Sequence, residues 1–244
     1  MPPFRWITSY FTKTKILLWM VSALLITAPF LIFDRTHWLT LTDYLTGVTA
    51  IMFNAKSNLF GQFLMIVFSL RYGYISYTFS YYGEMITYLG MRMPMANFAL
   101  IAWFRHPFNG KRSQVEVGSL QRPEILVMFG LTAVVTFGFY LILKYFHTDN
   151  LLPSTLSIAT SFVAVYLTFR SSPYFSLAYA LNDVVLIMLW TLANFENTRY
   201  LSVVVCFMAL LCMDLYGFIS WKAMKRQQET TSALSDAPAS AGRT

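Results

Sequence analysis

Residues 174–190, YFSLAYALNDVVLIMLW, and residues 199–221, RYLSVVVCFMALLCMDLYGFISW, decide the fold of this chain. Each run is apolar and near the length of about 20 residues that a helix needs to cross a bilayer. Asn182, Asp183 and Asp214 nevertheless lie inside these runs. A polar side chain at membrane depth is costly unless it faces a partner or a cavity, so these residues predict a binding site or a pore.

The composition of the whole chain indicates an integral membrane protein. Hydrophobic residues make up 57% of the sequence and charged residues only 12%, with a mean hydropathy of +0.53. Soluble domains carry about 25% charged residues. The net charge of +7 comes from basic residues in short loops and at the ends, which favours contact with anionic lipids over binding to nucleic acid.

Hydropathy predicts eight membrane spans in an all-α protein. Their approximate bounds are 15–33, 40–54, 58–77, 81–103, 124–146, 153–170, 174–193 and 199–221. The first span is expected to be a retained helix, because no cleavage site of small residues follows it. Residues 227–244 are rich in Ser, Ala, Thr and Gln, a composition that predicts a disordered tail.

The distribution of basic residues predicts the orientation of the chain. With eight spans and a cytoplasmic N-terminus, the outer connections hold only four basic residues, Arg35, Arg71, Lys144 and Arg199. Most of the other Lys and Arg residues fall in inner segments. The positive-inside rule therefore predicts that both termini are cytoplasmic. We expect the protein to cross the inner (plasma) membrane of the cell several times.

An internal repeat relates two parts of the chain. Tyr72, Tyr82 and Trp103 precede Trp190, Tyr200 and Trp221 by the same number of residues. The third and fourth spans would then match the seventh and eighth, and the fifth would link the two halves. Such a duplication is typical of transporters that bind their substrate between the halves, near the middle of the membrane.

The spacing of the polar residues suggests what the site binds. Asp183 and Trp190 are seven residues apart and share one helix face, and Asp214 and Trp221 repeat this spacing. A carboxylate and an indole on one face suit an aromatic solute with a positive charge. Asn182 can donate and accept hydrogen bonds, as an amide or a sugar hydroxyl requires.

The repeat and the sequence neighbourhood add Tyr72, Asn97, Trp103 and Tyr216 to the candidate binding residues. The alternative is that Asn182, Asn97 and Asp214 only join neighbouring helices through hydrogen bonds. Arg92 is expected either to pair with a carboxylate or to extend toward the membrane surface, and Pro94 is expected to bend the fourth span.

No motif indicates enzymatic chemistry. The sequence contains no GxxxxGK[ST] loop, no HExxH helix and no Cys/His cluster. We therefore expect no catalytic residues, no metal site and no cofactor.

Three stretches resemble the Pnu-type vitamin transporters, in particular the PnuC-like nicotinamide riboside transporters. They are YALNDVVLIMLW (179–190), CMDLYGFISW (212–221) and PMANFALIAWFRHPF (94–108), which VEV (115–117) follows. The resemblance covers residues 42–225 in order. One departure concerns the fourth span, where many relatives have a Gly-Trp pair and an amide side chain at the positions of Ala99, Leu100 and Ala96.

The resemblance implies a SWEET-like arrangement of two three-helix bundles joined by a linker helix, preceded here by one extra span. The segments would be residues 1–39 (tail and extra helix), 40–103 (first bundle), 104–152 (basic loop and linker helix), 153–221 (second bundle) and 222–244 (tail). It also implies facilitated diffusion of nicotinamide riboside for NAD biosynthesis, and a homotrimer.

Three hypotheses follow for function. In the first, the chain imports nicotinamide riboside, whose pyridinium ring lies against Trp190 with Asp183 or Asp214 supplying negative potential. In the second, the same architecture imports another vitamin such as thiamine, which is also an aromatic cation. In the third, the chain is a membrane scaffold or enzyme subunit whose polar residues bond to a partner helix.

Overall fold

Nearly all of the described chain is helical. The computed structural model describes residues 13–33, 38–78, 82–108, 111–148, 150–194 and 201–236. The elements are α2 (Lys13–Phe33), α3 (Trp38–Asn54), α4 (Leu59–Thr78), α5 (Tyr82–Thr87), the π-helix η1 (Tyr88–Arg92), α6 (Met93–Arg105), β1 (Pro107–Phe108), β2 (Lys111–Val115), α7 (Arg122–Tyr145), α8 (Leu151–Phe169), α9 (Phe175–Asn194) and α10 (Leu201–Asp236).

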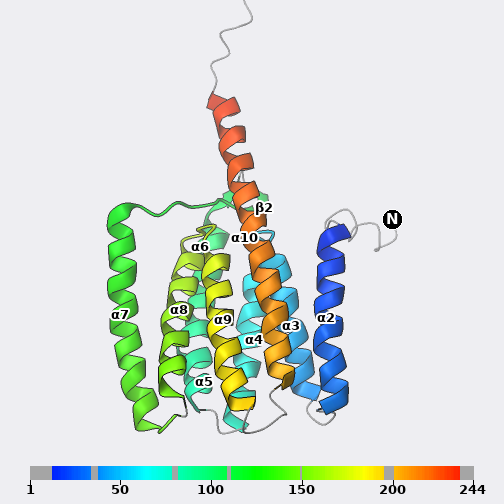
Figure 1. Cartoon of the computed structure of the whole chain (residues 1–244). Coiled ribbons are helices and arrows are strands. Elements are labelled where there is room, and N and C mark those ends of the chain that lie inside the picture. Colours follow the sequence, from blue (N-terminus) through cyan, green and yellow to red (C-terminus); the bar gives the residue numbers. More distant parts are fainter. Residues whose placement is uncertain are drawn as a thin grey trace, which may run out of the picture.

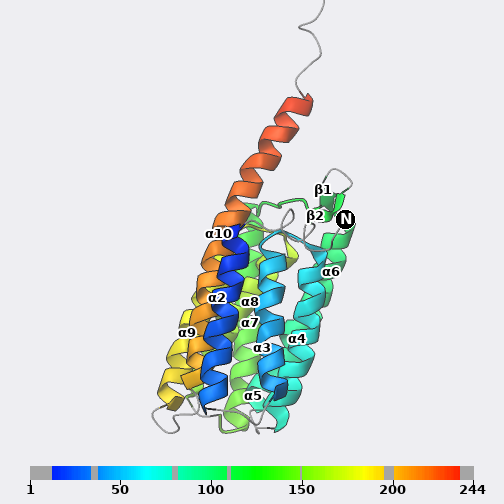
Figure 2. The same cartoon turned by 90° about the vertical axis from the view of Figure 1, so that its right-hand side faces the viewer.

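The helices run side by side between two ends (Figures 1 and 2). We call the end that carries β1 and β2 the hairpin end, and the opposite one the far end. In the described chain, six helices are long and apolar enough to cross a membrane: α2, α4, α7, α8, α9 and α10. The prediction of a helical membrane protein is therefore confirmed.

The fourth predicted span, residues 81–103, is not one continuous α-helix. It consists of α5, η1 and α6, with Pro94 in the first turn of α6. Pro94 has no N–H group to donate to the carbonyl of Gly90, one turn earlier. The helix accommodates this loss in the π-helical turn that precedes Pro94, and this turn carries the buried Arg92.

The helices form two connected groups. In one, α4 packs against α3 and α6, and in the other, α9 packs against α8 and α10. The contacts of α6 with α8 and of α3 with α10 join the groups. Helix α7 lies at the edge against α8, and α2 lies against α3 and α10 (Figure 1).

Two tryptophans close the hairpin end of the bundle. Trp103 at the end of α6 donates its Nε1–H to the Thr168 carbonyl on α8, at 2.9 Å. Trp221 on α10 donates in the same way to the Asn54 carbonyl at the end of α3, at 2.7 Å. The two indoles are almost fully buried, with ring centroids 5.5 Å apart. Each tryptophan thus ties one helix group to the other.

The two acceptor carbonyls belong to matching turns. Ser57 and Ser171 follow them with left-handed φ angles of 54° and 51°, and each donates its backbone N–H to the same carbonyl that accepts the tryptophan. The end of β2 and the residues after it contact both turns, since Val115 N–H donates to the Ser57 carbonyl and Gly118 N–H to the Ser171 carbonyl. The hairpin end therefore contains the same local structure twice.

The predicted disordered tail is partly wrong, because α10 continues through residues 222–236. Gln228 explains the difference. Its side chain is buried, accepts from Val117 N–H at 2.9 Å and donates to the Val115 carbonyl at 3.1 Å. An ion pair between Lys225 and Glu229, one turn apart, adds local support. Residues 1–12 and 237–244, which belong to the predicted terminal tails, lie outside the described residues.

We predict that Gln228→Ala loosens the end of α10. Two hydrogen bonds to backbone groups are lost, each contributing about 1 kcal/mol. Backbone amides of residues 229–236 should then exchange hydrogen for deuterium several-fold faster. Gln227→Ala is the matched control, because Gln227 is exposed. Equal exchange in the two variants would show that the Gln228 contacts do not hold the helix.

Candidate functional site

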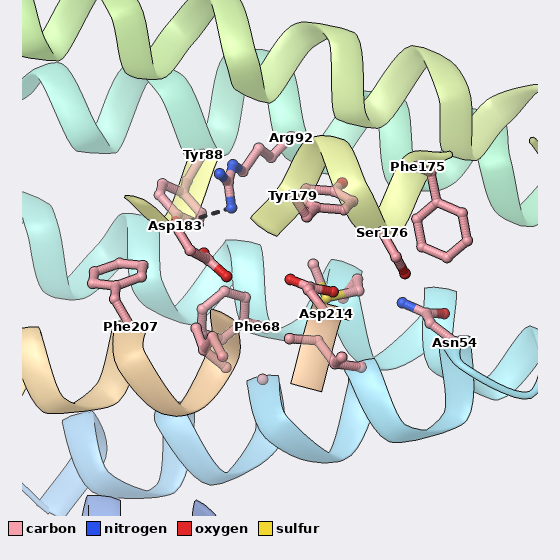
Figure 3. A pocket seen from close by; sticks show the side chains of 14 residues that line it. Asn54, Phe68, Tyr88, Arg92, Phe175, Ser176, Tyr179, Asp183, Phe207 and Asp214 are labelled. Atoms are coloured by element: carbon pink, nitrogen blue, oxygen red, sulfur yellow. Dashed lines mark hydrogen bonds between the residues drawn. The ribbon is translucent and has the colours of Figure 1, made fainter. Parts of the chain in front are cut away.

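A cavity of about 560 Å³ lies between α3, α4, η1, α9 and α10. We call it the main cavity. Its lining combines five aromatic rings with three charged side chains (Figure 3). The aromatic residues are Phe68, Tyr88, Phe175, Tyr179 and Phe207, and the charged ones are Arg92, Asp183 and Asp214.

Asp183 and Asp214 form a carboxyl pair on one wall of the main cavity. They come from α9 and α10, both are buried, and their side chains lie within hydrogen-bonding reach of each other. Close packing of these helices brings them together, since a Cβ atom on Gly217 would lie 2.6 Å from Ser176 Oγ. Within the described chain, Asp183 Oδ2 has no hydrogen-bond partner and remains available to a ligand.

Arg92 supplies the opposite charge from η1. It is only 8% exposed, and its guanidinium donates to Tyr88 Oη at 3.2 Å and to Ser161 Oγ at 2.7 Å. The guanidinium also lies 4.6 Å from the centroid of the Tyr88 ring and 5.8 Å from that of Tyr179. Figure 3 shows this group on the same side of the cavity as Asp183. Arg92 is thus held in place by contacts from η1, α8 and α9.

Asn182 lies behind Arg92 and outside the lining of the main cavity. Its hydrogen-bonding surroundings orient the amide, so that the oxygen accepts from Arg92 Nη2 at 2.8 Å. The amide nitrogen donates to Thr160 Oγ1 and Ser161 Oγ, each at 2.9 Å. Asn182 is only 1% exposed. In this structure Asn182 therefore holds the Arg92 side chain in position.

The structure brings together some of the candidate residues and separates others. Asp183 and Asp214 line the main cavity, whereas Trp190 packs with Leu186, Val204 and Phe207 toward the far end. Trp103 closes the hairpin end.

The remaining three candidates also lie outside the cavity lining. The Tyr72 ring packs at a tilt against that of Tyr88, with ring centroids 4.2 Å apart. Asn97 donates to the Met93 carbonyl of its own helix. Tyr216 lies under Lys15 of α2. Tyr72 thus packs on Tyr88, a residue of the main cavity.

Several lining residues were not among the sequence-based candidates. The sequence could have indicated Arg92 as a site residue, since it is a charged residue inside a predicted span, but it did not show that Arg92 contacts Asn182. Asn54, Ser176 and Tyr179 also line the cavity. They lie near predicted helix ends, where polar residues are common, so nothing in the sequence distinguished them.

Comparison with known proteins identifies the family. The family model described as nicotinamide mononucleotide transporter matches residues 37–223. The chain belongs to this family. A relative in Neisseria mucosa, named nicotinamide riboside transporter PnuC, is 26% identical over 214 residues, which cover 85% of this chain and 81% of the relative.

A solved structure has the same fold. The crystal structure of the vitamin B3 transporter PnuC matches with a TM-score of 0.77 and 21% sequence identity, over 89% of this chain and 94% of the other. The residues that match the family model, 37–223, contain α3 to α9 and the first part of α10.

We predict that Asn182→Leu lowers the free energy of unfolding by about 2 kcal/mol, because Arg92 loses a buried hydrogen-bond acceptor. Asn97→Leu is the matched control, with an expected change below about 0.5 kcal/mol, since its amide bonds within its own helix. Unfolding of the purified protein in detergent measures both. Equal losses would contradict the role of Asn182 in holding Arg92.

Proposed function

We propose that this chain is a membrane transporter that imports nicotinamide riboside by facilitated diffusion for NAD biosynthesis. The observation that carries the proposal is the pairing of Asp183 and Asp214 on one wall of an aromatic cavity. Carboxyl groups and ring faces both attract a cationic aromatic ring, and nicotinamide riboside carries such a ring. The relative named as a nicotinamide riboside transporter supports the same substrate.

The charges of the main cavity favour the riboside over the mononucleotide. A phosphate group would have to lie close to Asp183 and Asp214 in surroundings of low dielectric, where repulsion between like charges is strong. Arg92 offers limited compensation, because it is one basic residue in a lining that has two acidic ones. The uncharged ribose avoids this repulsion.

We propose that all eight helical segments cross the membrane. Helix α3 has 17 residues, and the α5–η1–α6 segment is interrupted, but both run alongside the six apolar helices (Figures 1 and 2). Their apolar character is diluted by Asp43 and Arg92, whose side chains are buried within the bundle. Burial inside the protein is how membrane-spanning segments accommodate such residues.

We also propose a SWEET-like duplication, with α3, α4 and α5–η1–α6 as one bundle, α8, α9 and α10 as the other, and α7 as the linker. The matching pairs at the hairpin end support it: Trp103 with Trp221, and Ser57 with Ser171. Rocking of one bundle against the other would expose the main cavity alternately to the two sides of the membrane.

In this proposal the hairpin end faces the cytoplasm, with both termini on that side. Described residues Arg105, Arg122, Arg170 and Lys222 lie in or beside the segments at this end, as the positive-inside rule requires. Only 11% of the membrane-spanning part of α7 is buried within the protein. Its apolar surface would therefore contact membrane lipids or other copies in a homotrimer. The proposed function requires no enzymatic step and no cofactor.

We predict that Asp183→Asn and Asp214→Asn each lower the uptake of nicotinamide riboside at least tenfold at low substrate concentration. Each substitution keeps the side-chain shape but removes an acidic group, and tenfold corresponds to about 1.4 kcal/mol. Flux into proteoliposomes without ATP or an ion gradient is the measurement. Glu124→Gln is the control, since Glu124 pairs with Arg170 away from the main cavity.

Uptake by both aspartate variants at the wild-type rate would contradict the site. Flux that strictly requires an ion gradient would contradict facilitated diffusion. If thiamine competes more strongly than nicotinamide riboside, thiamine becomes the proposed substrate, and the main cavity remains the proposed binding site.

A further inference from the structure

A short segment crosses the hairpin end from one helix group to the other. We call residues 115–118 the strap. Its first residue, Val115, ends β2, which packs against α4 and α6, and its N–H donates to the Ser57 carbonyl between α3 and α4. Its last residue, Gly118, donates its N–H to the Ser171 carbonyl between α8 and α9. The strap is therefore attached to both groups.

The strap packs on the rings that close this end of the main cavity. Phe175 lines the cavity, and its ring centroid is 4.9 Å from that of Trp221 and 6.4 Å from that of Trp103. Val115 is almost fully buried and packs in the same hydrophobic cluster. A path from the main cavity to the hairpin end would therefore have to part these rings and the strap.

A side chain of α10 adds a second attachment to the strap. Gln228 accepts from Val117 N–H at 2.9 Å and donates to the Val115 carbonyl at 3.1 Å. Glu116, between these two residues, donates its N–H to the His106 carbonyl instead. Backbone groups that alternate in this way belong to an extended segment, in which residues two apart form hydrogen bonds on the same side. The Gln228 amide thus takes the place of a neighbouring strand.

The extension of α10, residues 222–236, makes a matching contact one turn earlier. Met224 Sδ accepts from Ser57 Oγ at 3.2 Å, and its side chain is buried on the same helix face as that of Gln228. Figure 1 shows α10 continuing beyond the bundle here. The match to the family model ends at residue 223. These contacts between α10, a helix of one group, and the Ser57 turn and strap thus involve side chains outside the matched part of the chain.

We propose that the extension of α10 is a latch, which holds the strap across the hairpin end and keeps the main cavity closed on that side. The inference rests on the proposed function in one respect, the alternating access of the main cavity. Rocking of the two bundles moves the Ser57 turn away from α10, so Gln228 and Met224 must release their partners before the hairpin end opens. Because these contacts stabilise only the closed state, the latch sets how often the cavity opens toward the hairpin side.

Labelling of a cysteine in the main cavity tests the latch. Ile51 lines the cavity on α3, and Ile51→Cys supplies a single thiol in a background of Cys206→Ala and Cys212→Ala. The membrane-impermeant thiol reagent MTSET is added to inside-out vesicles, in which the hairpin end faces the reagent. We expect Gln228→Ala to raise the labelling rate at least fivefold, because the loss of two hydrogen bonds increases the population of the open state.

A second variant and a control make the result specific. Gly118→Ala should also raise the labelling rate, since a Cβ atom at this position would lie 2.4 Å from the Arg170 carbonyl oxygen and push the strap away from that turn. Gln227→Ala removes an exposed amide from the same extension and should leave the rate unchanged. Equal rates in Gln228→Ala and Gln227→Ala, or an increase only in right-side-out vesicles, would overturn the latch.

Protection by nicotinamide riboside is measured in the same vesicles. The riboside should slow the labelling of Ile51→Cys when the latch is intact, because both molecules enter the main cavity. A failure to protect would overturn the proposed substrate site. The comparison of labelling rates needs no substrate, so it decides the latch separately.

Discussion

A guanidinium buried in a membrane-spanning bundle must find acceptors, and the centre of this protein is built around that requirement for Arg92. The π-helical turn before Pro94 carries the residue, α8 supplies Ser161, and α9 supplies Asn182. The rings of Tyr88 and Tyr179 lie close to the charge. These contacts come from three segments far apart in the sequence, so satisfying one side chain fixes their relative positions and gives the cavity a rigid wall.

The acidic part of the lining follows from a different constraint, the close approach of α9 and α10 at Gly217. It places Asp183 beside Asp214 in the lining that Arg92 also belongs to. A cavity lined by two acidic groups, one basic group and several rings distinguishes molecules by the placement of their charge. An aromatic cation with an uncharged polar arm fits this pattern, whereas a molecule with a phosphate on that arm does not.

The sequence predicted a helical membrane protein and drew attention to two aspartates inside spans, which line the main cavity, because each inference depends on hydropathy within a single span. It could not predict which neighbour each helix face would meet. Trp190 shares a face with Asp183, yet it packs against Val204 and Phe207. Asn182 contacts Arg92, 90 residues earlier in the chain. The helical tail was missed for the same reason, since the partners of Gln228 are the backbone groups of Val115 and Val117.

The most direct measurement is an experimental structure of the protein with nicotinamide riboside bound. The pyridinium ring should lie in the main cavity, beside Asp183 and Asp214 and among the rings of Phe68, Tyr88 and Tyr179. A riboside bound against Trp190 at the far end, with the main cavity left to solvent, would contradict this account of the site.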